Sequence, residues 1–283
     1  MHLTRATFDG LRKVVYQHCG LVVPDDKEYL IRDRLGAVIR QRSLNSFDDL
    51  CERLLRGGEA TLIEAVIDAV TTQETSFFRD APVFDSLAAE VFPQLAAGAR
   101  AASGRVRIWS AGVSTGQEAY SLAILAQEFL AGGRGVKLPG TAFSILGSDI
   151  SADALHKAQA GVYEARDVAR GLSPARVRQY FEHNAGSYRV GAATGRLVEF
   201  RRVNLASVNQ AQSIAPLGVF DLICCRNVLI YFDPPTRERI CRQFHAMLAD
   251  GGRLLLGSAE NLYGISDDFV SHPLGQALVY RKV

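Results

Sequence analysis

The segment Arg105–Tyr120, RVRIWSAGVSTGQEAY, combines residue types that can hold a nucleotide-like ligand. A short apolar run through Trp109 ends at small residues that include Gly112 and Gly116, and a helical pattern of apolar residues follows at once. This order predicts a strand, a tight glycine loop and a helix. Open α/β sheets bind such ligands in this way, at the carboxyl end of a strand.

Glu118 stands at the start of the expected helix. A carboxylate there opposes a phosphate, because a helix N-terminus and bare amides favour an anion themselves. The acid therefore fits a ligand with hydroxyls or a cation, which favours S-adenosylmethionine over a dinucleotide. A dinucleotide-dependent oxidoreductase would also need a GxGxxG loop, and the spacing from Gly112 to Gly116 does not supply one.

Polar residues follow two further expected strands. Asp149 ends the strand after the glycine loop, where it can bind two ribose hydroxyls or cap the helix that starts near Ser151. Asn204 and Leu205 come after the segment VEFRRV. An asparagine there is commonly a turn residue, but its amide can also pair with a base edge while a leucine packs on the ring.

Two more segments carry candidate site residues. The apolar run Phe220–Cys225 ends at Arg226 and Asn227, and Tyr231 follows close to a rigid Pro-Pro pair. The segment TTQETSFFRD, residues 71–80, lies between two regions of different pattern and reads as a hinge. All these groups must be positioned at one edge of a sheet if they act together.

The chain from about residue 105 alternates strands and helices, which predicts a mostly parallel sheet. We expect strands at 105–110, 143–149, 197–203, 219–225, 252–258 and 276–281, and helices at 116–130, 151–160 and 235–249. Residues 131–140 are expected to form a loop, and residues 269–283 an antiparallel hairpin. Residues 161–198 break the alternation and predict an insertion, with a helix after Ser173-Pro174 and a small hairpin that pairs 188–190 with 197–198.

Residues 1–70 predict a small all-helical domain with four apolar stripes, spaced as on one face of a helix. Ser46 is a plausible N-cap for the third helix. The second helix carries Arg32, Arg34, Arg40 and Arg42. These arginines scatter around the helix, so they are either solvated or in contact with an acidic protein partner.

The composition limits the classes of protein to which the chain can belong. The chain has 283 residues and a formal net charge of +2, which gives no support to nucleic-acid binding. No apolar run approaches the roughly 20 residues of a membrane span, and the N-terminus lacks an apolar signal core. The five cysteines form no CxxC pair, and the six histidines show no zinc spacing. We therefore expect a cytoplasmic protein without a metal.

Several motifs together resemble the CheR family of chemotaxis-receptor methyltransferases. They are TTQETSFFRD, WSAGVSTGQEAYS, SDIS, VEFRRVNL, FDLICCRNVLIYFD and the late GSAENL, and the resemblance runs from about Thr4 to Tyr280. It implies an α/β, Rossmann-like S-adenosylmethionine-dependent methyltransferase fold at 91–283 with an inserted β-subdomain at about 161–198. A helical domain at 1–70 and a linker at 71–90 that contributes to the active site precede it.

The resemblance also implies roles for single residues. Arg79 and Tyr231 are expected to be catalytic, Tyr231 as the family's active-site tyrosine. The cofactor-binding residues are expected to be Gln73, Thr75, Arg79, Gly112, Glu118, Asp149, Asn204, Leu205, Arg226 and Asn227. Gln73 departs from the family's usual asparagine, and Gln117 and Ala119 depart from the usual STGEEPYS, whereas Glu118 is retained.

The implied reaction is methylation of glutamate side chains on the cytoplasmic domain of methyl-accepting chemotaxis receptors. S-adenosylmethionine is the implied cofactor and S-adenosylhomocysteine its product, with no metal. Some family members dock a receptor C-terminal peptide on the insert. The insert looks shorter here, so we expect no dependence on such a tether. We also expect the protein to be a monomer.

Three other functions compete with this one. A nucleic-acid methyltransferase would need a basic face and an asparagine near the Pro-Pro pair, but Asn227 is far from Pro234. A methyltransferase could act on another protein. A regulatory module could bind the cofactor without turnover, although the presence of Arg79 and Tyr231 argues against it.

Overall fold

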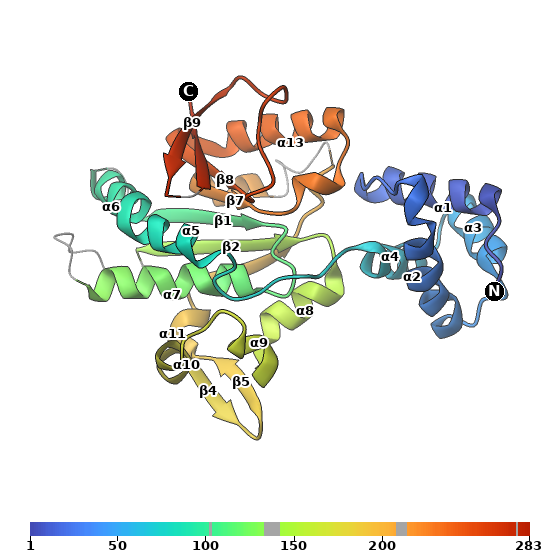
Figure 1. Ribbon diagram of the computed structural model, residues 1–283, viewed down its shortest axis with the longest axis horizontal. Coiled ribbons are helices and arrows are strands. Elements are labelled where there is room, and N and C mark those ends of the chain that lie inside the picture. Colours follow the sequence, from blue (N-terminus) through green and yellow to red (C-terminus); the bar gives the residue numbers. More distant parts are fainter. Residues whose placement is uncertain (102–103, 133–141, 208–213, 276) are drawn as a thin grey trace.

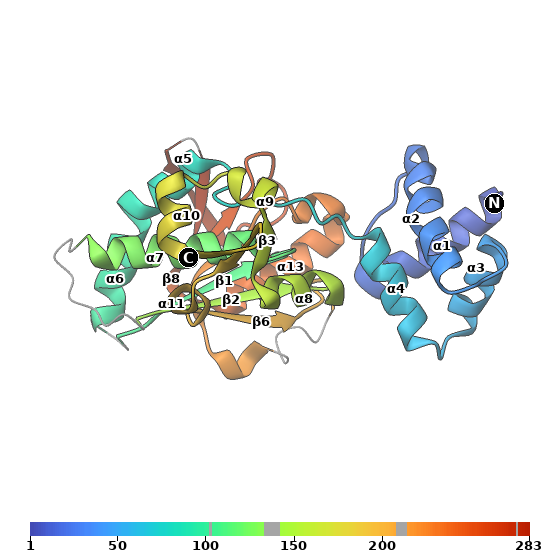
Figure 2. The same cartoon turned by 90° about the horizontal axis from the view of Figure 1, so that it is seen from below.

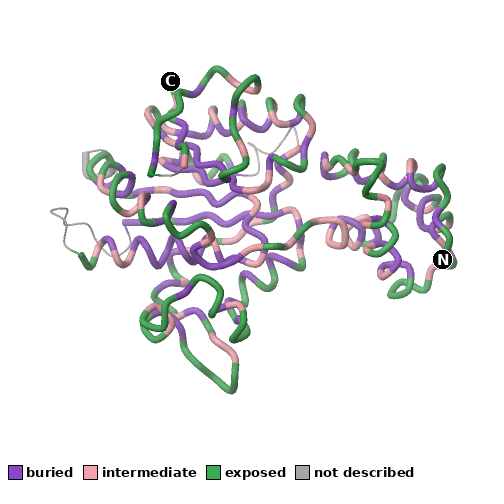
Figure 3. The backbone as a smooth tube through the Cα atoms, in the orientation of Figure 1, coloured by how far each residue is buried: buried purple, intermediate pink, exposed green. Residues whose placement is uncertain are grey.

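The computed structural model describes residues 1–101, 104–132, 142–207, 214–275 and 277–283. A group of helices at the N-terminus lies beside a larger α/β part, and one extended segment connects them (Figures 1 and 2). Buried residues gather along the central strands and on the inner faces of the helices (Figure 3). The described chain has no helix that is both long and apolar enough to cross a bilayer.

The N-terminal helices are α1 (Arg5–Cys19), α2 (Glu28–Gln41), α3 (Phe47–Arg56) and α4 (Ala60–Val70). The side chains of Thr4 and Ser46 cap α1 and α3 by accepting bonds from backbone N–H groups in the first turn. The apolar stripes of the four helices meet in one core, in which Phe8, Leu35 and Leu50 have no exposed surface. The helical region expected from the sequence is therefore present.

The central sheet has the strand order β6-β2-β1-β7-β8-β10-β9. These strands are β1 (Val106–Ala111), β2 (Phe143–Asp149), β6 (Val198–Arg202), β7 (Phe220–Cys225), β8 (Leu248–Leu256), β9 (Phe269–Leu274) and β10 (Ala277–Lys282). The first five in the order run parallel, and β10 pairs antiparallel with β8 and β9. The parallel sheet and the C-terminal hairpin agree with the prediction.

Helices cover both faces of this sheet. One face packs on α7 (Gln117–Ala131), α5 (Ala81–Ser86) and α6 (Phe92–Ala101), and the other on α13 (Pro234–Met247). The single tryptophan, Trp109, is fully buried against Phe244 of α13 and donates from Nε1 to Ser148 Oγ at 2.8 Å. Residues 81–91 are helical, ending in a π-helical turn at Leu87–Val91, so the extended linker ends at about residue 80.

The insertion contains helices and a separate three-stranded sheet with the order β3-β5-β4. Its elements are β3 (Val162–Glu164), α9 (Ala165–Ala169), α10 (Pro174–Tyr180), β4 (Phe181–Asn184), β5 (Ser187–Val190) and α11 (Ala192–Gly195), and α8 (Ala152–Ala160) precedes it. Gly161, where α8 ends, has a positive φ.

The predicted hairpin between 188–190 and 197–198 is wrong. β5 pairs with β4 through a tight turn at Ala185 and Gly186, both with positive φ. The residues after β5 form the short helix α11, and Val198 starts β6 of the main sheet. The expected loop at 131–140 lies almost entirely outside the described residues, which include Ala131 at the end of α7 and Gly132.

Candidate functional site

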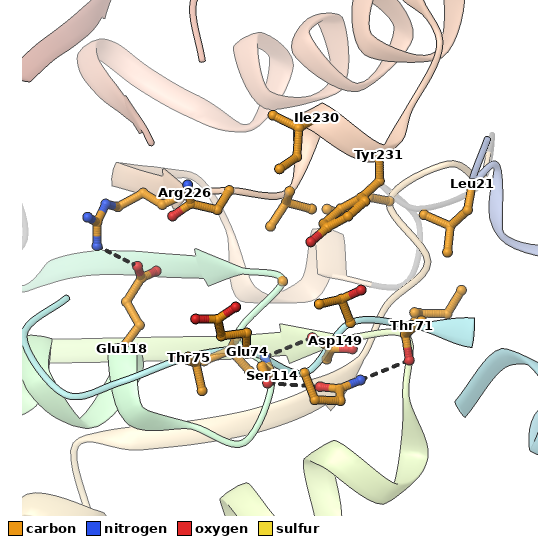
Figure 4. Close-up of a pocket in the computed structure, with 18 of the residues that line it drawn as sticks. Leu21, Thr71, Glu74, Thr75, Ser114, Glu118, Asp149, Arg226, Ile230 and Tyr231 are labelled. Carbon is orange, nitrogen blue, oxygen red and sulfur yellow. Dashed lines mark hydrogen bonds and ion pairs between the residues drawn. The ribbon is translucent and has the colours of Figure 1, made fainter. Parts of the chain in front are cut away.

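A cavity opens at the carboxyl edge of the parallel strands, between the sheet, the 71–80 segment and the end of α1 (Figure 4). Its lining includes every residue that the sequence predicted for the site: Gln73, Thr75, Arg79, Gly112, Glu118, Asp149, Asn204, Leu205, Arg226, Asn227 and Tyr231. Parallel strands bring these residues together because their carboxyl ends share one edge. Their individual contacts differ from the expected roles in several cases.

The glycine loop after β1 requires its glycine at position 112. Gly112 has φ +77°, and a Cβ there would lie 2.5 Å from a methyl group of Val228. The loop therefore packs directly on the segment after β7. Ser114 also has a positive φ, of 54°. Such backbone conformations in non-glycine residues are costly and gather at functional sites.

Glu118 extends from the first turn of α7 toward β7. One carboxylate oxygen accepts a hydrogen bond from Ser110 Oγ at 2.8 Å, and the other lies 3.1 Å from Nη1 of Arg226 (Figure 4). These two contacts fix the orientation of the carboxylate, whose side chain is 15% exposed. The cavity thus has a fixed negative group at one end.

Arg226 is a buried cation, with 2% of its side chain exposed. Its guanidinium donates to Glu118, to Asp80 at 2.6 Å and to the backbone carbonyl of Arg79 at 2.9 Å. These partners belong to the glycine-loop helix and to the linker, so Arg226 joins the two walls of the cavity. The contacts favour an indirect role for Arg226, in which it orients Glu118 and Arg79.

Asp149 is buried at the end of β2. Its two oxygens accept from the backbone N–H groups of Ser114 at 2.8 Å and Ser151 at 3.0 Å. Ser151, and not Asp149, caps α8, by accepting from the N–H of Ala154. Burial raises the pKa of Asp149 above its usual value, against the lowering effect of these backbone bonds. A carboxylate has about four acceptor sites, so Asp149, which lines the cavity, retains acceptor capacity for a ligand hydroxyl.

The linker contacts the glycine loop through Gln73. Its amide Nε2 donates to Thr71 Oγ1, and its Oε1 accepts from Ser114 Oγ, each at 2.8 Å. The long side chain therefore spans from linker to loop. Thr75 lines the same wall. Arg79 lies between two residues with left-handed backbone conformations, Phe78 with a φ of 47° and Asp80 with a φ of 62°.

The insertion fixes the linker from the other side. The ring of Phe77 packs edge-on against Tyr163 and Phe181 of the insert, with centroid distances of 4.9 and 5.4 Å. The guanidinium of Arg176 lies over the ring of Phe78 at 3.9 Å. The insert and the segment that carries Arg79 are therefore packed together through aromatic contacts.

Asn204 and Asn227 have different local environments. Asn204 donates from Nδ2 to the backbone carbonyl of His18 at 2.8 Å and accepts from the N–H of Ala206 at 3.0 Å, so both ends of its amide bind the protein. Asn227 has a φ of 59°, and its buried Oδ1 has no partner among the described residues. The Oδ1 of Asn227 is thus a buried acceptor without a partner there, and both asparagines line the cavity.

The helical part completes the cavity beside Tyr231. The N–H of Val22 donates to the carbonyl of Tyr231 at 3.0 Å, and Leu21 pairs with Phe232 as an isolated antiparallel bridge. The hydroxyl of Tyr16 donates to Asp233 at 2.8 Å. The hydroxyl of Tyr231, whose side chain Figure 4 shows beside Ile230 and Leu21, points into the cavity.

The sequence does not decide whether the arginines of α2 are solvated or contact an acidic protein partner. Three of them have contacts within the chain: Arg32 with Glu28, Arg34 with the carbonyl of Val70 at 2.6 Å, and Arg42 with the carbonyl of Thr61 at 3.2 Å. Arg34 thereby fixes the end of α4 where the linker begins. These contacts favour a structural role for Arg34.

Four contributors to the site were missed by sequence reasoning. Ser114 and Asp80 are partners of predicted residues, and Leu21 comes from the helical part. Glu260 holds the backbone after β7, and its motif GSAENL was noted only as part of the resemblance. In the described chain, no group of three or more His, Cys, Asp or Glu residues could hold a metal ion.

Known families match nearly all of this chain. The model described as "CheR methyltransferase, SAM binding domain" matches residues 73–277, and the one described as "CheR methyltransferase, all-alpha domain" matches residues 6–71. The chain belongs to the CheR methyltransferase family. The cavity lies in the family's SAM-binding domain, at its junction with the all-alpha domain.

Curated relatives of this CheR methyltransferase cover almost its full length. Chemotaxis protein methyltransferase 1 of Vibrio cholerae is 40% identical over 266 residues, which are 93% of this chain and 92% of that protein. Chemotaxis protein methyltransferase 1 of Pseudomonas aeruginosa is 38% identical over 99% of both chains. The Escherichia coli chemotaxis protein methyltransferase is 34% identical, over 92% of this chain and 85% of that protein.

Proposed function

We propose that this protein transfers a methyl group from S-adenosylmethionine to glutamate side chains on the cytoplasmic part of methyl-accepting chemotaxis receptors. The observation that carries this proposal is one cavity that joins fixed acceptors with Arg79 and Tyr231. The names of the relatives support the substrate class. The proposed enzyme is a cytoplasmic monomer that uses no metal and needs no receptor tether.

The residues present fit S-adenosylmethionine. The wall offers two carboxylates, Glu118 and Asp149, which suit a ligand with an ammonium group, a cationic sulfur and ribose hydroxyls. Glu118 would face the ammonium end, Asp149 the ribose, and Leu205 the adenine ring. When bound, this cofactor would supply a methyl group attached to a cationic sulfur. After transfer of the methyl group, the sulfur remains as a neutral thioether.

The protein needs no general base for this reaction. A free glutamate side chain has a pKa of ~4.3, so the substrate carboxylate is already ionised at neutral pH. The task of the enzyme is to align a carboxylate oxygen with the methyl carbon while excluding water. Arg79, held between two left-handed residues, would orient the carboxylate by hydrogen bonds. The hydroxyl of Tyr231 would donate to the same group.

Labelled S-adenosylmethionine and a purified receptor cytoplasmic domain test the proposal. We expect label to enter the receptor fragment and to be released by mild base as methanol, which identifies a methyl ester. A fragment with its methylation-site glutamates changed to alanine is the matched control. Base-stable label would indicate a different acceptor, and cofactor binding without transfer would indicate a regulatory module.

A further inference from the structure

We propose that Glu260 is a positioning residue of this site, acting through the loop that carries Asn227 and Tyr231. The inference rests on the proposed function and adds a residue to it. Glu260 lies in the turn after β8 and does not line the cavity. Its effect on the reaction is therefore transmitted through the backbone that it holds.

The carboxylate of Glu260 accepts four backbone hydrogen bonds. Oε2 accepts from the N–H of Asn227 at 2.6 Å and of Gly257 at 2.8 Å, and Oε1 accepts from Val228 at 3.0 Å and Ile230 at 3.2 Å. Hydrogen bonds to an ionised acceptor are about twice as strong as neutral ones. Three of the four donors belong to the segment between Arg226 and Tyr231, so one side chain sets the path of that segment.

The same contacts stabilise an unfavourable backbone conformation. Asn227 has a φ of 59°, which is uncommon for a residue other than glycine. The segment directs the buried Oδ1 of Asn227 and, four residues later, the ring of Tyr231. Without the carboxylate, relaxation of Asn227 would move both groups. Both residues line the cavity, and the proposed function assigns Asn227 to the cofactor and Tyr231 to the substrate.

Gly257 allows the turn after β8 to approach the segment 227–230 closely. A Cβ at position 257 would lie 2.8 Å from Nδ2 of Asn227, 2.8 Å from Oε2 of Glu260 and 2.9 Å from the N–H nitrogen of Asn227. The close approach leaves no space for a side chain. The residues Gly257 and Glu260 of the GSAENL motif therefore serve one purpose, which is to bring an acceptor against the backbone of Asn227.

The first test compares E260Q with D221N in the full chain. Glutamine replaces one acceptor oxygen with a donor group that faces two N–H groups, so half of the contacts are lost. Asp221 is a matched control, because it accepts one backbone bond from Arg107 at 2.8 Å at the other end of β7. Hydrogen exchange should become faster at residues 227–230 in E260Q and stay unchanged there in D221N.

Two functional measurements follow. Calorimetric affinity for S-adenosylhomocysteine should fall about tenfold in E260Q, which is the effect of one ordinary hydrogen bond, and less than twofold in D221N. Methyl transfer should fall about 100-fold, because a small displacement of a reacting group has that effect. E260D, which keeps the charge on a shorter side chain, gives a second variant with an intermediate loss on all three measurements.

A double-mutant cycle with Tyr231 decides whether Glu260 acts through the loop. At saturating S-adenosylmethionine, where weaker cofactor binding no longer limits the rate, E260Q/Y231F should transfer little less than Y231F alone, since the hydroxyl that Glu260 positions has then been removed. Losses that multiply independently would overturn the proposal, as would unchanged hydrogen exchange at 227–230 in E260Q. Hydrogen exchange and the affinity for S-adenosylhomocysteine can both be measured without the receptor reaction. Absence of receptor methylation in the unmodified protein would therefore refute the proposed function without deciding this inference.

Discussion

The carboxylate of Glu118 lies 3.1 Å from the buried guanidinium of Arg226, and the same guanidinium lies 2.6 Å from Asp80. One cation therefore links the helix after the glycine loop with the linker. Glu118 and Asp80 are 38 positions apart in sequence, and neither has another cation within salt-bridge distance among the described residues. The carboxylate proposed to face the cofactor and the geometry of the linker are consequently coupled through Arg226.

Removal of this cation should strongly destabilise the fold. R226M leaves Glu118 with a mostly buried charge and no cation, and loss of one partner of a buried ion pair costs about 3 kcal/mol. Asp80 is 41% exposed and adds little. Urea unfolding measures the change. R32M is the control, since its exposed pair with Glu28 should change the free energy of unfolding by less than about 0.5 kcal/mol.

Cofactor affinity should depend on the ionisation of Asp149. Two ribose hydroxyls donate best to an ionised carboxylate, and burial raises the pKa of Asp149 above its usual value. Affinity for S-adenosylhomocysteine should therefore be constant at high pH and fall as the pH drops through this raised pKa. Calorimetry from pH 8 downward measures it. In D149N the affinity should be lower at pH 8 and the pH-dependent part of the loss should disappear.

The same shift has the opposite sign for folding. A raised pKa means that the folded state favours protonated Asp149, so this contribution to the free energy of unfolding is fully present below the pKa of the unfolded chain. It is lost as the pH rises through the folded-state pKa. Cofactor binding, which favours ionised Asp149, should therefore offset this contribution, so the complex should lose less stability than the unliganded protein as the pH rises through this pKa.

Arg79 should matter for turnover more than for binding. R79A should lower methyl transfer to a receptor fragment by at least about 100-fold, because the substrate carboxylate loses its orienting donor. The affinity for S-adenosylhomocysteine should change several-fold at most. R79K retains the charge without the planar pair of donors and should lie between the two. Near-normal turnover of R79A would remove Arg79 from the catalytic role.

The aromatic contacts of the insert should support the linker. F77L removes the edge-on contacts with Tyr163 and Phe181, which are worth about 1 kcal/mol beyond the area that the ring buries. We expect weaker cofactor binding, because Gln73 and Thr75 lie on the same segment. F129L is a matched control with similar ring contacts away from the linker. Equal cofactor affinities in the two variants would show that the insert does not act on the linker.

A receptor C-terminal peptide should not bind to the insert. Its sheet is small, with β4 and β5 of four residues each. Calorimetry with such a peptide should give no binding heat at micromolar concentration, and removal of the receptor tail should leave methyl transfer unchanged. Micromolar binding would contradict the expected independence from a tether.

The groups that end strands could be predicted from the sequence, because the polar residue after an apolar run marks its position. Asp149, Arg226 and Asn227 follow from this signal, and all three line the cavity. The mode of contact could not be predicted for Arg226 and Asn204. Their partners are Asp80 and the carbonyl of His18, which only the tertiary fold brings near.

The insert illustrates a different failure. Gly191 and Gly195 look like turn residues, but Gly191 precedes a short helix and Gly195 ends it. The actual hairpin turn uses Ala185 together with Gly186, and alanine carries no turn signal. Glu260 could not be predicted for a related reason. Its partners are backbone N–H groups, which nearly every residue carries, so the sequence does not mark the positions that it binds.

The burial of Trp109 has a practical consequence. It is the only tryptophan in the chain, and its indole binds Ser148, the residue before Asp149. The protein thus contains an intrinsic fluorophore that is hydrogen-bonded to the neighbour in sequence of the carboxylate proposed to hold the ribose. A change in the emission of Trp109 would allow the occupancy of the cavity to be followed in stopped flow, without a label and without the receptor.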